Sequence, residues 1–177
     1  MEFDGEVLWD CGLVSMMTLP GGWRLRASED GGFAQWTAHH FGPADDPSLG
    51  ISIYLPGIVA TVADGLLYLT AVTPGLRRFD EEDLRDLAPV LSDMGDDNRF
   101  ELHRIRGEYW NFLNVLFVEG VWRASGTRNA KLFVDQRGDG RLIQEIGAYA
   151  PASDRAGYEL GLEALSGISW REQSCRI

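Results

Sequence analysis

Tyr109-Trp-Asn-Phe-Leu-Asn-Val-Leu-Phe-Val118 is the run of residues on which the expected architecture of this 177-residue chain depends. Eight of its ten side chains are apolar or aromatic, and they fall at both odd and even positions. Because successive side chains of a β-strand point to opposite faces, a strand with this sequence must be covered on both faces. We therefore expect Tyr109–Val118 to form a central strand of a layered α+β domain.

The residues around this run predict an antiparallel sheet followed by a helix. From Arg99 to Trp170 we expect three or four antiparallel strands, one amphipathic helix and a short apolar tail. Asp139-Gly140 tolerates the positive φ angles of a tight hairpin turn, which would join the last two strands. We expect the helix to have Ser153 as its N-cap and to end at Gly167.

The expected helix has an apolar stripe and two glycines. Its stripe follows the spacing of one helical face and consists of Tyr158, Leu162 and Leu165. Gly157 and Gly161 lower the helix propensity by roughly 1 kcal/mol each relative to alanine. We expect that a close approach of this helix to a neighbouring sheet or helix compensates for them.

The first half of the chain predicts short strands separated by turns rich in glycine and proline. These expected strands are Leu13–Leu19, Trp23–Ser28, Phe33–Phe41 and Ile51–Tyr54. Val7-Leu8-Trp9 fits either a short edge strand or an arm. Ile58–Val72 mixes residues favoured in helices with residues favoured in strands, and we prefer a helix over Ala63–Val72. Asp80–Met94 predicts a helix because acidic residues crowd its first turn, where the helix dipole favours them.

Together these elements predict an α+β fold, with an antiparallel sheet of about six or seven strands and helices packed on its faces as a layered sandwich. The chain shows no internal repeat, no low-complexity segment and no linker that would divide it. We therefore expect residues 1–177 to form a single domain. Cys11 and Cys175 are expected to be reduced thiols, with a disulfide between the two ends of the chain as the alternative.

The chain is acidic, and its negative charge is concentrated in one segment. The net charge is −11, and Asp80–Asp97, with eight acidic residues and one arginine, contributes −7 of it. Nucleic acids and anionic membranes attract the opposite sign, so we expect neither as a partner. A basic protein partner fits this segment, and a solvated acidic helix face is the alternative. The N-terminus has neither the basic region nor the apolar core of a secretory signal, so we expect a cytoplasmic protein.

The histidines and cysteines do not form a metal-binding pattern, because none has the close spacing of a zinc site. His39 and His40 are neighbours in an expected strand, so their side chains would point to opposite faces. Nucleophile-elbow, phosphate-loop and metalloprotease motifs are absent from the sequence, and we expect no catalytic residues, no metal and no cofactor. Trp36 and His40 would share one face of their strand, where they either line a pocket or are ordinary half-buried residues.

The order of several motifs along the chain resembles one known superfamily. These motifs are Leu19-Pro-Gly-Gly-Trp23, the Gly138-Asp-Gly140 turn, Ile143-Gln-Glu-Ile-Gly-Ala-Tyr-Ala-Pro151 and Ile168-Ser-Trp170. Over residues 12–172 the sequence is similar to the PsbP/DcrB-like superfamily, which includes the PsbP extrinsic photosystem subunit, bacterial DcrB-like proteins and a Ran-binding nuclear-import factor. The resemblance implies an antiparallel sheet with helices on its faces and a role in binding proteins rather than in catalysis. Some DcrB-like domains are chaperones for secreted effectors, and the resemblance assigns no functional residue in this chain.

The leading hypothesis is a non-enzymatic protein-binding domain that acts as an adaptor, a chaperone or an immunity-type factor. Its binding residues would be Asp80, Glu81, Glu82 and Asp83, at the start of the expected acidic helix. The alternative is a small-molecule-binding protein or an enzyme whose pocket lies between the sheet and Ile58–Met94, near Trp36 and His40. A homodimer that uses an exposed sheet edge is a third hypothesis.

Overall fold

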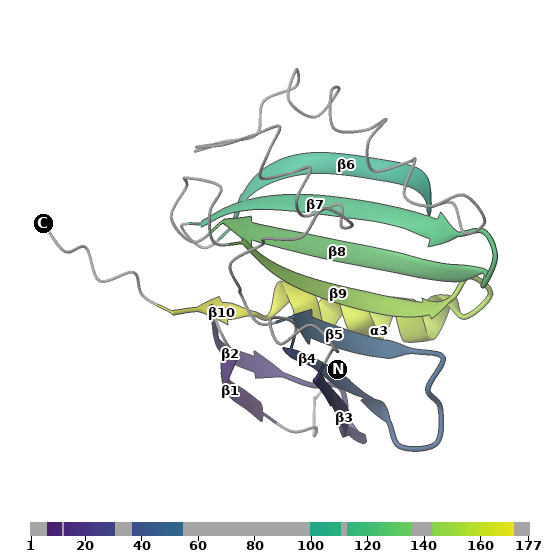
Figure 1. Cartoon of the computed structure of the whole chain (residues 1–177), viewed down its shortest axis with the longest axis horizontal. Helices are drawn as coiled ribbons and strands as arrows, with labels where there is room; N and C mark the ends of the chain where they lie inside the picture. The colour runs from purple at the N-terminus through teal and green to yellow at the C-terminus, as the bar shows by residue number, and fades with distance from the viewer. Residues whose placement is uncertain are drawn as a thin grey trace, which may run out of the picture.

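The computed structural model of the chain describes residues 7–11, 13–30, 37–54, 100–110, 113–135 and 143–171. The strands of its large sheet are β3 Trp23–Asp30, β4 Thr37–Pro43, β5 Gly50–Tyr54, β6 Phe100–Trp110, β7 Leu113–Trp122, β8 Thr127–Asp135 and β9 Ile143–Pro151. They lie in the order β3-β4-β5-β9-β8-β7-β6, and every neighbouring pair is antiparallel (Figure 1). The helix α3, Arg155–Ser166, packs on one face of this sheet against β9.

A small sheet brings the two ends of the described chain together. It consists of β1 (Val7–Cys11), β2 (Val14–Thr18) and β10 (Ser169–Trp170), with β2 between the other two. β1 is therefore an edge strand rather than an arm. A buried hydrogen bond connects this sheet to the large one, because the backbone N–H of Leu13 donates to Oε1 of Gln144 in β9 at 2.6 Å.

The run Tyr109–Val118 does not form one strand, so this expectation is wrong. Trp110 ends β6, Leu113 begins β7, and the two residues lie opposite each other in the antiparallel register. The chain reverses between them, where the sequence has Asn111, a residue type common in turns that the prediction treated as part of a strand. β7 is also not central, because it lies between β8 and β6, whereas β9 occupies the middle of the sheet.

The expectation that both faces of this run are covered is confirmed for β7. Val115 and Phe117 point to the side of α3 and belong to the main core. Leu116 and Val118 point to the opposite side, where they are 0 % and 1 % exposed. β7 is thus a strand with apolar side chains buried on both faces, as its sequence requires.

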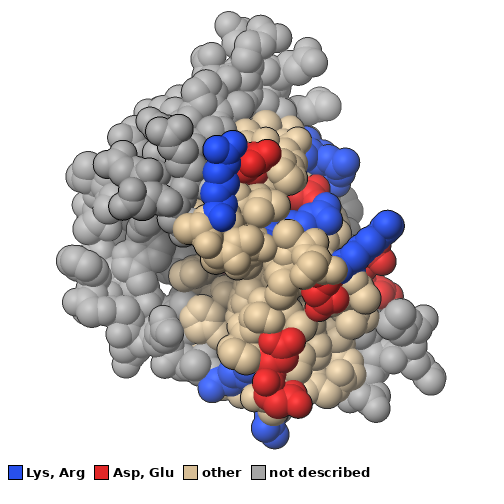
Figure 2. Space-filling model, turned by 90° about the vertical axis from the view of Figure 1, so that its right-hand side faces the viewer, with Lys and Arg blue, Asp and Glu red and all other residues tan. Residues whose placement is uncertain are grey.

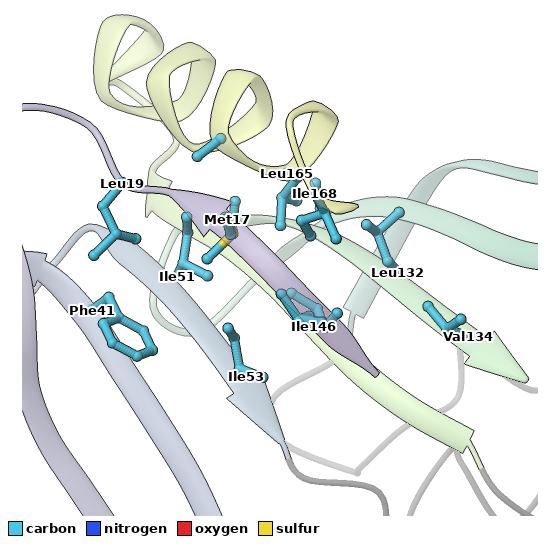
Figure 3. Close-up of a cluster of buried hydrophobic side chains, with 14 of the residues drawn as sticks. Met17, Leu19, Phe41, Ile51, Ile53, Leu132, Val134, Ile146, Leu165 and Ile168 are labelled. Carbon is cyan, nitrogen blue, oxygen red and sulfur yellow. The ribbon is translucent and has the colours of Figure 1, made fainter. Parts of the chain in front are cut away.

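The main core lies between the large sheet and a layer made of α3 and the small sheet (Figure 3). Met17 of β2, Ile51 of β5, Ile146 of β9 and Leu165 of α3 are each less than 2 % exposed. Figure 3 shows these side chains gathered between the helix, β2 and the strands of the large sheet. Burying one side chain of this size contributes about 1.5–3 kcal/mol to stability, so this cluster holds the layers together.

The helix α3 begins one residue later than predicted. Its N-cap is Asp154, whose carboxylate accepts a hydrogen bond from the backbone N–H of Gly157 at 3.0 Å, so Ser153 is not the cap. A carboxylate at this end is also favoured by the helix dipole. A Cβ on Gly157 would collide with the Asp154 carboxylate, so this glycine accommodates the cap rather than a neighbouring element. Gly167 is the C-cap, as expected.

The buried face of α3 differs slightly from the expected stripe. Tyr158 and Leu165 are buried as predicted, whereas Leu162 is half-buried. A Cβ on Gly161 would lie 2.8 Å from the Cβ of Ala148 in β9, which is closer than such atoms can approach. The expected close contact with a sheet is thus confirmed at Gly161.

Among the described residues the fold is mostly antiparallel β with one helix, so helices on the sheet are confirmed only for α3. Most expected strands are observed, as β2, β3 and β5, and the strand expected over Phe33–Phe41 is described from Thr37 onward as β4. Several expected elements lie outside the described residues, namely the helices over Ala63–Val72 and Asp80–Met94 and the Asp139-Gly140 turn. The single domain over residues 1–177 remains a prediction.

Candidate functional site

One of the six predicted binding residues, His40, lies in the described part of the chain, in β4. The other five lie outside it, namely Trp36, Asp80, Glu81, Glu82 and Asp83. The shared face of Trp36 and His40 and the contact made by the acidic group therefore remain predictions.

His40 is half-buried on the face of the large sheet opposite α3. Its Nδ1 lies 2.8 Å from Oγ of Ser52, its direct neighbour on β5. Its ring also meets that of Tyr54 edge-on, with 6.5 Å between the ring centroids. His39 lies on the other face, where its ring is 6.5 Å from that of the core residue Phe41. The two histidines thus point to opposite faces, as their adjacency predicted.

On the same face as His40, the side chain of Arg26 reaches from β3 across two strands to β9. Its Nη1 donates to the backbone oxygen of Asp46 at 2.5 Å, and its Nη2 donates to the hydroxyl of Tyr149 at 2.5 Å. A Cβ on Gly42 would lie 2.8 Å from Cζ of Arg26, and one on Gly50 would lie 2.7 Å from Nη2. The atoms closest to these two Cβ positions are backbone oxygens, that of Leu49 at Gly42 and that of Phe41 at Gly50, so the backbone packing as well as the guanidinium favours glycine at both positions. Burial raises the pKa of Tyr149, and the charge of Arg26 offsets part of this rise.

An ion pair crosses the next two strands on this face. Nζ of Lys131 on β8 lies 2.7 Å from Oε1 of Glu145 on β9, and their side chains are 18 % and 11 % exposed. The ammonium group also lies over the ring of Trp122, 5.8 Å from its centroid. The polar groups of this face are thus engaged with one another across neighbouring strands.

Glu119 is a buried carboxylate on the side of the sheet that faces α3, and it is 7 % exposed. Nε of Arg128 on β8 donates to its Oε1 at 3.1 Å, and Nη2 of the same arginine donates to the same oxygen. The hydroxyl of Tyr158 on α3 donates to this oxygen at 3.0 Å. Cζ of Arg128 lies 4.1 Å from the centroid of the Tyr158 ring. We call these three residues the Glu119 cluster.

The Glu119 cluster has a defined protonation state near neutral pH. Burial alone would raise the pKa of Glu119, but the hydrogen bonds from Arg128 and Tyr158 outweigh it and lower that pKa. Burial and the neighbouring carboxylate raise the pKa of Tyr158. The carboxyl group therefore stays ionised and the phenol stays protonated. Such a pair suits the attachment of α3 to the sheet better than proton transfer to a substrate.

The sequence prediction missed the Glu119 cluster, although one signal for it was present. Glu119 follows Val115 and Phe117 at two-residue intervals, so it shares their buried face in a strand. A buried carboxylate requires a cation or several donors. That rule predicts a partner for Glu119, but the partner's identity depends on how β8 and α3 pack around it.

Within the described ranges, no group of three or more histidine, cysteine, aspartate or glutamate side chains is placed to hold a metal ion. In the same part of the chain, no helix is long and apolar enough to cross a membrane.

The described surface shows no separation of charge on the face seen in Figure 2, where basic and acidic side chains interleave. Exposed ion pairs such as Arg123–Glu101, at 3.2 Å, and Arg155–Glu159, at 2.7 Å, mix the two signs further. Exposed pairs of this kind contribute about 0–1 kcal/mol to stability. The described part of the face seen in Figure 2 therefore offers little attraction for a partner of one charge.

Comparison with solved structures finds similarity in fold. No family model matches the chain, and no curated protein is similar to it in sequence. The solution structure of cyanobacterial PsbP (CyanoP) from Synechocystis has a TM-score of 0.57 at 11 % identity and covers 94 % of this chain and 92 % of its own. The crystal structure of PA94 from Pseudomonas aeruginosa, a protein of unknown function, has a TM-score of 0.47 at 13 % identity and covers 96 % of this chain and 100 % of its own.

At such low identity the likeness to CyanoP concerns the fold, which does not by itself define a function. The antiparallel sheet that the sequence resemblance implied is present, and the likeness extends over nearly the whole chain. The chain therefore has a PsbP-like fold.

Proposed function

We propose that this chain is a cytoplasmic protein-binding domain without catalytic activity, of the adaptor, chaperone or immunity type. Its partner is a protein with a basic surface, which contacts Asp80, Glu81, Glu82 and Asp83. The observation that carries the proposal is the uneven distribution of charge. The described residues have 13 acidic and nine basic side chains, a difference of −4, whereas Asp80–Asp97 alone has eight acidic and one basic, a difference of −7.

The interactions of the buried polar groups support a role other than catalysis. Glu119 is held by Arg128 and Tyr158, and Arg26 is held by Tyr149 and a backbone oxygen. Catalytic groups are commonly titratable side chains whose pKa values are shifted toward the working pH. The shifts of Glu119 and Tyr158 run the other way, away from neutral pH.

The proposal is tested by capturing partners from a lysate of the source organism on the immobilised chain. The test variant carries Asp80→Asn, Glu81→Gln, Glu82→Gln and Asp83→Asn. A matched control removes the same charge from exposed positions elsewhere, with Asp45→Asn, Glu101→Gln, Glu159→Gln and Glu163→Gln. We expect a specific protein that the wild type and the control retain and the test variant loses. Equal retention by all three chains would contradict the acidic contact.

A second candidate function is the binding of a small molecule on the sheet face opposite α3. The observation that favours it is the grouping there of His40, Tyr54 and the Arg26–Tyr149 pair, because ligand sites combine aromatic surface with a few polar groups. A thermal-shift screen with metabolites and metal ions tests it. A ligand should raise the Tm of the wild type and of His103→Ala, an exposed control, but not that of His40→Ala. A flat response of the wild type would rule this function out for the compounds screened.

A further inference from the structure

The strand β6 ends the described large sheet, and β7 is its neighbour there (Figure 1). Within the described part of the chain, no strand pairs with its other side. The backbone N–H and C=O groups along such an edge can pair with a strand of another molecule. β6 is 11 residues long, so it offers a long edge for this kind of contact.

A bulge divides β6 into two parts. Its register against β7 shifts between Leu102 and Arg104, and a bulge of this kind turns an edge away from a partner. Beyond it, Arg104–Trp110 pairs without interruption with Leu113–Glu119. The second part of β6 is therefore the part that can extend the sheet.

The second part of β6 carries charged side chains on the face of the sheet that packs against α3. Arg104 and Arg106 are exposed, and Glu108 is half-buried. Nε of Arg106 lies 2.5 Å from Oε1 of Glu108, and its guanidinium lies over the ring of Phe117 at 4.8 Å from the centroid. Two positive charges are thus followed by one negative charge along the same face.

We propose that a second copy of the chain binds this edge, with the two β6 strands antiparallel and with Gly107 opposite Gly107 of the second copy. In this register Arg106 faces Glu108 of the second copy, and Glu108 faces its Arg106. Arg104 faces Trp110 of the second copy, a pairing of a cation with an aromatic ring. Gly107 has no side chain, so the two Gly107 residues can lie opposite each other at the centre of the contact without a side-chain clash.

Like charges disfavour the neighbouring registers. A contact centred on Arg106 would set two guanidinium groups against each other, and one centred on Glu108 would oppose two carboxylates. A contact centred on Ile105 would place Arg104 against Arg106 of the second copy. Among these centres, Gly107 is the one at which every charged side chain meets an opposite charge or a ring. The axis is two-fold, so each of these contacts occurs twice in the dimer.

The dimer is weak. A pairing limited to Arg104–Trp110 buries less area than the roughly 1,600 Å² of a standard interface. The net charge of −11 on each copy also opposes association. At physiological ionic strength the Debye length is about 8 Å, which screens this repulsion more than the directly paired charges.

The test is sedimentation of the full chain at physiological ionic strength over a dilution series. The chains compared are the wild type, Arg106→Glu, Glu108→Arg and the double swap Arg106→Glu with Glu108→Arg. Each single change sets two like-charge pairs across the contact and should weaken association by about tenfold or more. The double swap restores opposite charges and should recover it. Glu159→Arg, the same change on the exposed surface of α3, is the control and should leave association unaltered.

Circular dichroism confirms that each variant is folded before its association is measured. A monomeric wild type at the highest concentration would overturn the proposal, whatever the variants do. Association that the single changes leave unaltered would also overturn it, as would a double swap that fails to recover. This test does not involve Asp80–Asp97, so its outcome is independent of the proposed partner-binding function.

Discussion

Tyr158 of α3 donates a hydrogen bond to Glu119 of β7 at 3.0 Å and so connects the helix to the large sheet through a buried carboxylate. Arg128 of β8 supplies the compensating positive charge. A buried carboxylate without such partners would destabilise the fold by several kcal/mol. The position of α3 thus depends on a polar contact as well as on the apolar core.

Removing the hydroxyl of this contact should destabilise the protein. We expect Tyr158→Phe to lower the free energy of unfolding by roughly 1–2 kcal/mol, because Glu119 loses one of its donors inside the fold. Urea denaturation at neutral pH measures this change. In a double-mutant cycle with Glu119→Gln, the two effects should be less than additive, since Tyr158→Phe removes the hydrogen bond to this side chain and Glu119→Gln removes the charge that strengthens it. Fully additive effects would show that the two residues are not coupled.

The pH dependence of stability should report the charge of Glu119. Its pKa is lower in the folded chain than its ordinary value of 4.5, so its contribution to stability is complete above that value and is lost as the pH falls through the folded pKa. The stability difference between the wild type and Glu119→Gln should therefore shrink on acidification from neutral pH to about pH 3. Urea denaturation over this range checks it. A difference that is constant with pH would contradict the lowered pKa.

The close contact between α3 and β9 predicts that a larger residue at Gly161 destabilises the protein and that a smaller residue at Ala148 restores stability. Gly161→Ala should destabilise the protein by roughly 1–3 kcal/mol, because its Cβ would press on the Cβ of Ala148, and this outweighs the gain of about 1 kcal/mol in helix propensity. Adding Ala148→Gly should recover much of the loss. Thermal and urea unfolding measure both.

Gly147, the neighbour of Ala148 in β9, provides the control for the substitutions at Gly161 and Ala148. A Cβ on Gly147 would meet the backbone oxygen of Ala130 at 3.4 Å and Cγ of Lys131 at 3.7 Å, which is ordinary contact. Gly147→Ala should therefore change stability much less than Gly161→Ala. A neutral Gly161→Ala would show that the helix can move away from β9 at little cost.

The hydrogen bond between Arg26 and Tyr149 predicts that the pKa of Tyr149 depends on the charge of Arg26. Burial raises the pKa of Tyr149, and the positive charge of Arg26 opposes this rise. Arg26→Met keeps much of the side-chain volume and removes the charge, so it should raise the pKa of Tyr149 further. Spectrophotometric titration, with Tyr149→Phe used to identify the signal, measures it. A lower pKa in Arg26→Met would mean that the guanidinium does not stabilise the phenolate.

Local patterns in the sequence predicted local structure well. The turn at Pro20-Gly-Gly22 is observed, with φ of +76° at Gly22 and a hydrogen bond of 3.0 Å from the N–H of Trp23 to the oxygen of Pro20. A positive φ favours glycine, so this signal is carried by the residue itself. The helix near the C-terminus, with its cap at Gly167, followed in the same way from spacing, whereas the expected apolar tail after it proved to contain the short strand β10.

Features that depend on contacts between distant residues were missed. The periodicity of Tyr109–Val118 indicated burial but not the reversal of the chain between Trp110 and Leu113, because Asn111 is a weaker signal than a glycine or a proline would be. The pairing of β5 with β9, in which Ile51 lies opposite Ala148, was also not predictable from the sequence of either strand. The Glu119 cluster combines two strands with a helix, so the partners Arg128 and Tyr158 are recognisable only once those elements are packed.

The most direct test of the proposed function is the affinity of the captured partner for the chain as a function of salt. The partner is titrated against the wild type, the variant neutralised at Asp80, Glu81, Glu82 and Asp83, and the matched control neutralised elsewhere. We expect the wild type and the control to bind with an affinity that falls steeply with salt, and the neutralised variant to bind more weakly with a shallower dependence. Equal affinities and equal salt dependence for all three chains would contradict the claim that this acidic group holds the partner.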